Sequence, residues 1–135
     1  MFQRVVIGHP PNFLRLCAEF GTVVQQPGVL FSYGDTLFNP DSMHVPSALR
    51  RHEAVHGERQ MAHGLDDWWE RYIADLGFRY EEELAAHRAE WRHYCAWHTN
   101  RQKRDVFLAQ ISMRLSSQLY GNIVSPSAAR DAIAA

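Results

Sequence analysis

The chain is poor in cysteine. Only Cys17 and Cys95 occur among its 135 residues, and they lack the C-x-x-C spacing of redox motifs and of many zinc sites. Both lie in apolar segments, FLRLCAEF and WRHYCAWH. We therefore expect two reduced core thiols, with a single disulfide as the less favoured alternative.

Strong net charge and long apolar runs are also missing. The formal net charge is −1, so no overall field attracts nucleic acid or an anionic membrane. No apolar run approaches the roughly 20 residues of a membrane span, and the segment MFQRVVIGHPP lacks the apolar core of a signal peptide. Repeats, linkers, Gly-rich phosphate loops and nucleophile elbows do not occur. We expect one globular domain over residues 1–135, without signal peptide or membrane span, in a reducing cytoplasm.

Breaker residues and apolar periodicity predict an α+β fold that is dominated by helices. Residues 1–12 read as irregular and are followed by a short helix that Gly21 ends. The β-prone pieces TVVQQ, GVLFSYG and DTLFNP predict a small antiparallel sheet near the N-terminus. The remaining chain predicts helices over the ranges 47–63, 65–77, 78–98, 105–121 and, after the Ser125-Pro126 cap, 126–135.

The central motif is His52-Glu53-Ala54-Val55-His56, an H-E-x-x-H string in a helix-favouring segment. Residues four apart lie above one another on a helix, so both imidazoles can reach one ion. The glutamate between them then stands beside that ion and can accept a proton from water. This pattern predicts zinc-assisted hydrolysis, most often of a peptide bond, but catalytic zinc also needs a third protein ligand.

The phase of this helix places the two histidines on a polar side together with Gln60 and His63. The apolar residues Ala48, Val55 and Ala62 form a separate side. This arrangement favours a helix that lines a cleft. The alternative, that the histidines are ordinary core or surface residues, remains open, and His63 lies too far along the helix to share the ion.

The third ligand is sought in the acidic cluster 81–83 of the next long helix. Helix phase puts Glu83 on a flank shared with His87 and Glu90, whereas Glu82 points roughly opposite the core and Glu81 lies on the other flank as an exposed ion-pairing residue. We therefore expect Glu83 to be the ligand, with His87 supporting it or replacing it. The alternative is that the three glutamates only stabilise an acidic first helical turn.

In these features the chain resembles the compact gluzincin-type metallopeptidases, in which a glutamate from the following helix completes H-E-x-x-H. More narrowly, it is similar to small zincin-like proteins of bacteriophages and prophages. The matching stretches are YGDTLFNP, HEAVHGERQ, WWERYIADLGFRYEEELAAHRAE and SSQLYGNIVS, which together cover most of residues 30–125. The resemblance implies zinc bound by His52, His56 and Glu83, with Glu53 as general base. It departs at His87, where the family has tyrosine.

Two further features carry weaker expectations. Tyr120 can supply the phenol that stabilises a tetrahedral oxyanion, or it can be a core tyrosine near a helix end, which is the favoured alternative. Trp91, Tyr94 and Trp97 beside basic residues suggest a surface that stacks nucleic-acid bases. Their spacing is that of a packed helix, however, and we expect no specific nucleic-acid partner.

Two functions follow from the motif and the resemblance. The first is a zinc metallopeptidase or amide hydrolase that acts on peptides or on peptidoglycan stem peptides. The second is a virion structural or assembly protein that keeps the fold and the metal, contacts other phage proteins and cleaves nothing. Either would reside in the host cytoplasm or in the virion.

Overall fold

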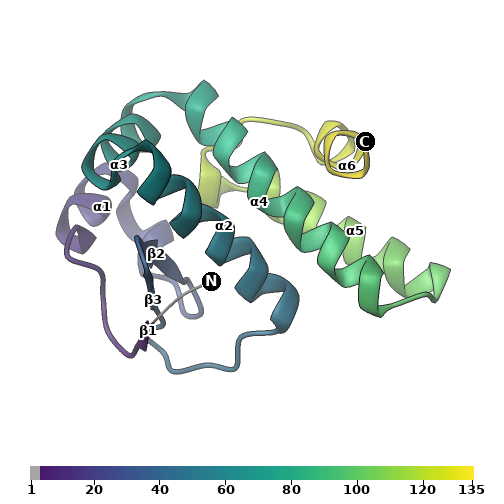
Figure 1. Ribbon diagram of the computed structural model, residues 1–135. Coiled ribbons are helices and arrows are strands. Elements are labelled where there is room, and N and C mark those ends of the chain that lie inside the picture. Colours follow the sequence, from purple (N-terminus) through teal and green to yellow (C-terminus); the bar gives the residue numbers. More distant parts are fainter. Residues whose placement is uncertain (1–3) are drawn as a thin grey trace.

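The computed structural model describes residues 4–135, which form an α+β fold dominated by helices, as predicted (Figure 1). In chain order the elements are β1 (Arg4–Val6), α1 (Phe13–Phe20), the 3-10 helix η1 (Gly21–Gln25), β2 (Phe31–Tyr33), β3 (Thr36–Phe38), α2 (Ser47–His63), α3 (Leu65–Ala74), α4 (Leu76–Trp97), α5 (Arg101–Leu115), the 3-10 helix η2 (Gln118–Tyr120) and α6 (Pro126–Ala134). None of the helices in the described range is long and apolar enough to cross a membrane.

The sheet corrects part of the prediction. Strands β2 and β3 form the expected antiparallel hairpin, and Gly34 in its turn has a positive φ of 63° that suits glycine. Strand β1 adds to β3 in parallel, so the sheet is mixed in the order β1-β3-β2. Residues 4–6 are therefore not irregular. Three residues are too few to show an alternating pattern, and their pairing with the range 36–38 is not local.

A second correction concerns residues 22–26, which we expected to be β-prone. They lie largely in the 3-10 helix η1. Val24 in this turn is buried in a small apolar cluster with Leu16 and Phe31, which we call the N-terminal cluster. Its packing outweighs the β-propensity of the two adjacent valines.

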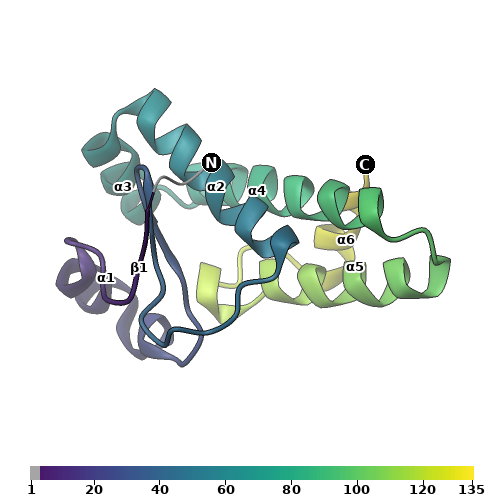
Figure 2. The same cartoon turned by 60° about the horizontal axis from the view of Figure 1, so that its bottom comes forward.

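The motif helix has the predicted bounds. It begins at Ser47, after Pro46, and ends at His63, before Gly64, whose φ of 105° favours glycine. Figures 1 and 2 show α2 between the sheet and α4. Gln60, which is fully buried, accepts a hydrogen bond from the Gly34 amide (2.7 Å) and donates one to the Ser32 carbonyl (3.0 Å). The helix is thereby fixed to the β2–β3 hairpin.

The later helix boundaries differ from the prediction by a few residues. Helix α4 begins at Leu76, so Gly77 lies inside it and does not end α3; the Asp75 carboxylate caps the new helix by accepting from the Phe78 amide. Helix α5 begins at Arg101 and ends at Leu115, before η2. The Ser125 cap of α6 is confirmed.

The larger of the two apolar clusters lies where α5 and α6 pack against α4. We call the buried residues there the C-terminal cluster, and they are Leu84, Leu108, Ile111, Leu115, Tyr120, Ala129 and Ile133. Cys17 and Cys95 are free and half-buried. Between the N-terminal and C-terminal clusters, α2 and α4 meet through charged and polar side chains.

Candidate metal centre

The packing of α2 against α4 brings the predicted residues together. Glu83 on α4 points at both motif histidines: its Oε1 lies 3.5 Å from His52 Nε2, and its Oε2 lies 3.1 Å from His56 Nε2. All three side chains are buried, with at most 5% of each residue exposed. Glu83 thus lies within reach of both motif histidines, although the compact group of possible metal ligands contains His52 and Glu83 but not His56.

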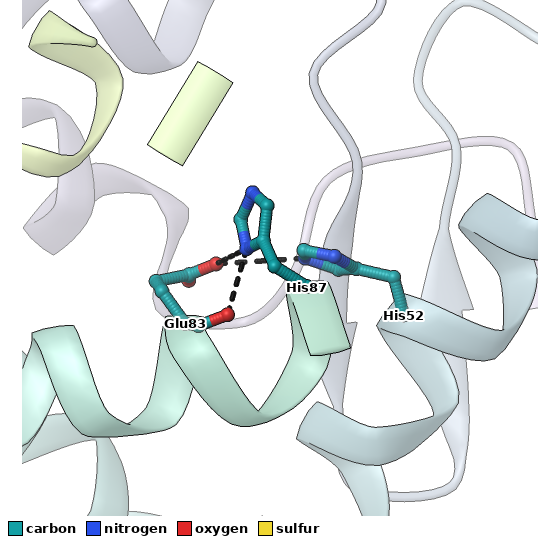
Figure 3. Close-up of side chains that lie close together, drawn as sticks. All are labelled: His52, Glu83 and His87. Atoms are coloured by element: carbon teal, nitrogen blue, oxygen red, sulfur yellow. Dashed lines mark hydrogen bonds and ion pairs between the residues drawn. The ribbon is translucent and has the colours of Figure 1, made fainter. Parts of the chain in front are cut away.

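His87 belongs to the same buried group. His52, Glu83 and His87 offer ligand atoms that all lie within 4.8 Å of one another, so they could bind a metal ion (Figure 3). The Nδ1–H of His87 donates to the Glu83 carbonyl one turn earlier, at 2.7 Å. Burial, together with the nearby charge on His52, holds the pKa of His87 well below its usual range, so the ring is neutral.

Three atoms of this group are buried without a hydrogen-bond partner among the described residues. They are Glu83 Oε1, His56 Nδ1 and His87 Nε2. Buried polar atoms are normally paired, because leaving one unpaired costs the full desolvation penalty. Imidazole nitrogens and a carboxylate oxygen are also the donor set of zinc and similar transition metals. The residues present therefore fit an ion.

The protonation states of Glu83 and His52 are also those expected of a site that binds a cation. Burial alone raises the pKa of Glu83, but the neighbouring His56 and His52 outweigh it and lower that pKa well below its usual range. Burial lowers the pKa of His52, but its contacts with the Glu83 and Glu90 carboxylates raise it to about 9. His52 is thus protonated and lies beside a carboxylate. A bound metal ion would displace that proton.

A chain of charged groups fixes the orientation of His52. Its Nδ1–H donates to Glu90 Oε1 at 2.9 Å, which turns Nε2 toward Glu83. Both terminal nitrogens of Arg114, on α5, donate to the Glu90 carboxylate at 2.9 and 2.7 Å. Burial raises the pKa of Glu90, but His52 and Arg114 bring it down to about 2. The roles of Glu90 and Arg114 were not predicted; the one signal in the sequence is that Glu90 follows Glu83 by seven residues on the same flank.

Glu83 has a second partner from α3. The Tyr72 hydroxyl donates to Glu83 Oε2 at 2.7 Å. Burial raises the pKa of Tyr72 well above its usual value, so the phenol keeps its proton as a hydrogen-bond donor. This contact orients the carboxylate without neutralising it.

Glu53 is buried beside the histidines and is held by the sheet. Its Oε2 accepts a hydrogen bond from the Ser32 hydroxyl on β2, at 2.6 Å. Its backbone carbonyl also lies 2.9 Å from the same hydroxyl. Ser32 was not anticipated, since no sequence pattern relates residue 32 to residue 53.

The helix-phase prediction that Glu82 points roughly opposite the core is wrong. Only 4% of the residue is exposed, and its carboxylate accepts from Arg59 (2.7–3.0 Å) and from Trp68 Nε1 (2.6 Å). The physical reason is that both α2 and α3 cover α4 here, so the helix is buried over more than one stripe. Glu81 and His63 are exposed, as expected.

A cavity of about 330 Å³ opens beside the centre. Tyr120 lines it and is also part of the C-terminal cluster, with its ring edge-on to His87 at 5.6 Å between ring centroids. Burial raises the pKa of Tyr120 well above its usual value, so its hydroxyl keeps its proton. The structure thus places this tyrosine both in the core, as the favoured alternative predicts, and beside the site.

The aromatic residues near the end of α4 are mostly packed. Trp91 packs against the C-terminal cluster, and the Tyr94 ring stacks on His98 and Phe107 at 3.9 and 3.8 Å between ring centroids. Trp97 is 75% exposed. The packed-helix interpretation is therefore confirmed for Trp91 and Tyr94.

Searches against protein-family models, curated proteins and solved structures each found no match.

Proposed function

We propose that the protein is a zinc metallopeptidase or related amide hydrolase of the gluzincin type, in which His52, His56 and Glu83 bind the metal and Glu53 is the general base. The observation that carries this proposal is the position of Glu83. Its two oxygens lie 3.5 and 3.1 Å from the Nε2 atoms of the motif histidines. Ligand atoms about 2.0–2.2 Å from a tetrahedral zinc are about 3.4 Å apart.

His56 is preferred over His87 as the third ligand. The Nδ1 edge of His87 faces Glu83 (Figure 3), and its proton is committed to the Glu83 carbonyl. The free Nε2 lies on another edge of the ring, so His87 would have to reorient to bind an ion at the Glu83 carboxylate. His56 already presents Nε2 to that carboxylate.

The remaining residues fit defined roles in amide hydrolysis. Bound zinc would supply a Lewis acid. Glu53, held by Ser32, accepts the proton of the attacking water and passes it to the leaving amine. Glu90 keeps the Nε2 of His52 turned toward the metal site. Tyr120 donates its hydroxyl proton in a hydrogen bond to the developing oxyanion.

The burial of the centre also favours a second candidate function, a virion structural or assembly protein with a closed metal site. The neutral, unpartnered Nε2 of His87 is the group that could become a fourth protein ligand. Four protein ligands are typical of structural zinc, whereas a catalytic site keeps one position open. The resemblance to phage zincin-like proteins is compatible with both functions.

The test begins with metal analysis of purified protein and of Glu53→Gln. We expect about one zinc per chain in both, because Glu53 stands beside the metal. Cleavage of a broad peptide library should occur with wild type and should fall by at least roughly 10²-fold in Glu53→Gln. Glu81→Gln, an exposed change on α4, is the matched control and should match wild type in both assays.

Two results would contradict the peptidase proposal. Protein that takes up no zinc lacks the centre altogether. Protein that binds zinc but cleaves neither the peptide library nor peptidoglycan stem peptides, and is unaffected by Glu53→Gln, is a scaffold.

A further inference from the structure

The cavity beside the metal centre has apolar walls. They come from four separate parts of the chain: α1 with η1, the segment into β2, α3, and the residues around η2. The apolar residues that form them include Leu16, Phe20, Val24, Phe31, Trp69 and Leu119. The same cavity reaches His52, Glu53, His56 and Glu83. A group held against these walls would therefore lie next to the reacting centre.

Apart from the centre itself, the cavity wall offers no unpaired charged side chain, and the unpartnered indole N–H of Trp69 is a neutral donor. Gln60 bonds to the hairpin backbone, and Ser32 bonds to Glu53. Arg114, the one lysine or arginine that lines the cavity within residues 4–135, directs both terminal nitrogens at Glu90. No cation is left over to receive a carboxylate of the ligand, and a charged group placed there would lose its hydration without compensation.

The size of the cavity indicates how much it can hold. A volume of about 330 Å³ is at the lower end of the range for small-molecule sites, which runs from about 300 to 1,000 Å³. It suits one large side chain and its backbone better than a long segment of polymer. Its walls would bury most of a leucine or phenylalanine side chain, and burial of apolar surface from water is favourable.

We propose that this cavity receives one bulky apolar side chain adjoining the scissile amide, so that the substrates are apolar peptides and not peptidoglycan stems. The inference deepens the proposed function and rests on it. Stem peptides carry free side-chain carboxylates or amines close to their amide bonds, and the cavity offers no unpaired charged partner for either. An aliphatic or aromatic side chain needs none.

The experiment uses zinc-loaded full-length protein and four N-acetyl amino-acid hydroxamates, of leucine, phenylalanine, glycine and glutamate. The hydroxamate group binds the metal in all four, so differences in affinity report the side chain. Calorimetry should show the leucine and phenylalanine compounds binding roughly tenfold to a hundredfold more tightly than the glycine and glutamate compounds. Their binding should also have the more negative heat-capacity change.

Variants locate the effect in the cavity. Val24→Phe fills the wall at η1, away from the centre, and should remove most of the apolar preference while zinc content is unchanged. Val106→Phe, the same change at a 53% exposed position on α5 outside the cavity, should behave as wild type. If Val24→Phe does not fold, Leu49→Trp narrows the cavity from α2, where residue 49 is only half-buried.

The outcomes separate this inference from the proposed function. Loaded protein that binds all four hydroxamates equally, or the glutamate compound most tightly, overturns the apolar site and leaves the zinc centre intact. An apolar preference that persists in the filled variant overturns it as well. Failure to bind zinc at all removes the proposed function, and this inference with it.

Discussion

Helix α4 has two adjoining buried faces, of which one makes apolar contacts and the other makes polar and charged contacts. One face contributes Leu84 to the C-terminal cluster, where α5 and α6 supply apolar side chains. The other face buries Glu83, His87 and Glu90 against α2. The first face is held together by the removal of apolar surface from water, which is non-directional. The second is held together by hydrogen bonds and ion pairs, each of which depends on a specific partner.

The difference teaches which face is maintained for folding and which for function. Buried ion pairs contribute little net stability, because desolvation of both charges offsets their attraction. Apolar residues of similar volume would pack α2 against α4 at least as well. A polar face that includes an unpartnered buried carboxylate oxygen, Glu83 Oε1, is thus poorly explained by stability. It is explained by an ion that this oxygen could bind.

The largest expected effect on stability lies in the apolar face. Ile111→Ala, at a position 1% exposed, should lower the free energy of unfolding by about 2–5 kcal/mol, because it removes buried methyl groups and leaves a cavity. The zinc content of the folded fraction should not change. Urea denaturation followed by metal analysis measures both. Val106→Ala, an exposed position on the same helix, is the control and should stay within about 0.5 kcal/mol of wild type.

If Ile111→Ala also abolished zinc binding in folded protein, the two faces would not be independent. Folding and metal binding would then depend on the same contacts.

The polar face should respond in the opposite way. Glu83→Ala should weaken zinc binding roughly a hundredfold or more, because an apparent zinc binding free energy of about 10–16 kcal/mol is shared among about four ligands. Glu81→Ala, two residues earlier and exposed, should leave the zinc affinity unchanged. Competition with a chromogenic chelator measures these affinities.

Glu82→Ala sharpens the same test. It leaves Arg59 and Trp68 without their shared acceptor, so it should lower stability more than zinc affinity. If Glu82→Ala lost as much zinc affinity as Glu83→Ala, the assignment of Glu83 as the ligand would be wrong.

Local signals made part of this site predictable. The H-E-x-x-H spacing places His52 and His56 on one side of α2, and Pro46 and Gly64 mark the ends of that helix. Helix phase then selects Glu83, because a ligand must lie on the side of α4 near its core stripe. These inferences need only the geometry of single helices, which the sequence encodes directly.

The parts that were missed depend on contacts between distant segments. The bond of Ser32 to Glu53 spans 21 residues, and that of Arg114 to Glu90 spans 24. Neither pairing has a sequence period. The error at Glu82 has the same origin, because a one-stripe view of α4 ignores that α3 also covers it through Trp68. The parallel pairing of β1 with β3 was equally non-local.

The smallest predicted effect concerns the contact that joins the two faces. Arg114 comes from α5, on the apolar side, and reaches His52 through Glu90. Glu90→Gln keeps the size of the side chain but removes the charge that orients His52 and pairs with Arg114. We expect zinc affinity to fall roughly tenfold to a hundredfold, the usual cost of losing a carboxylate behind a ligating histidine.

The matched control is Glu70→Gln on α3. It removes the charge of an exposed carboxylate that pairs with Arg15, and it should leave zinc affinity as in wild type. Chelator competition on both variants decides the matter: wild-type affinity in Glu90→Gln would mean that the apolar face has no influence on the metal centre, and that His52 is oriented by its position on α2 alone.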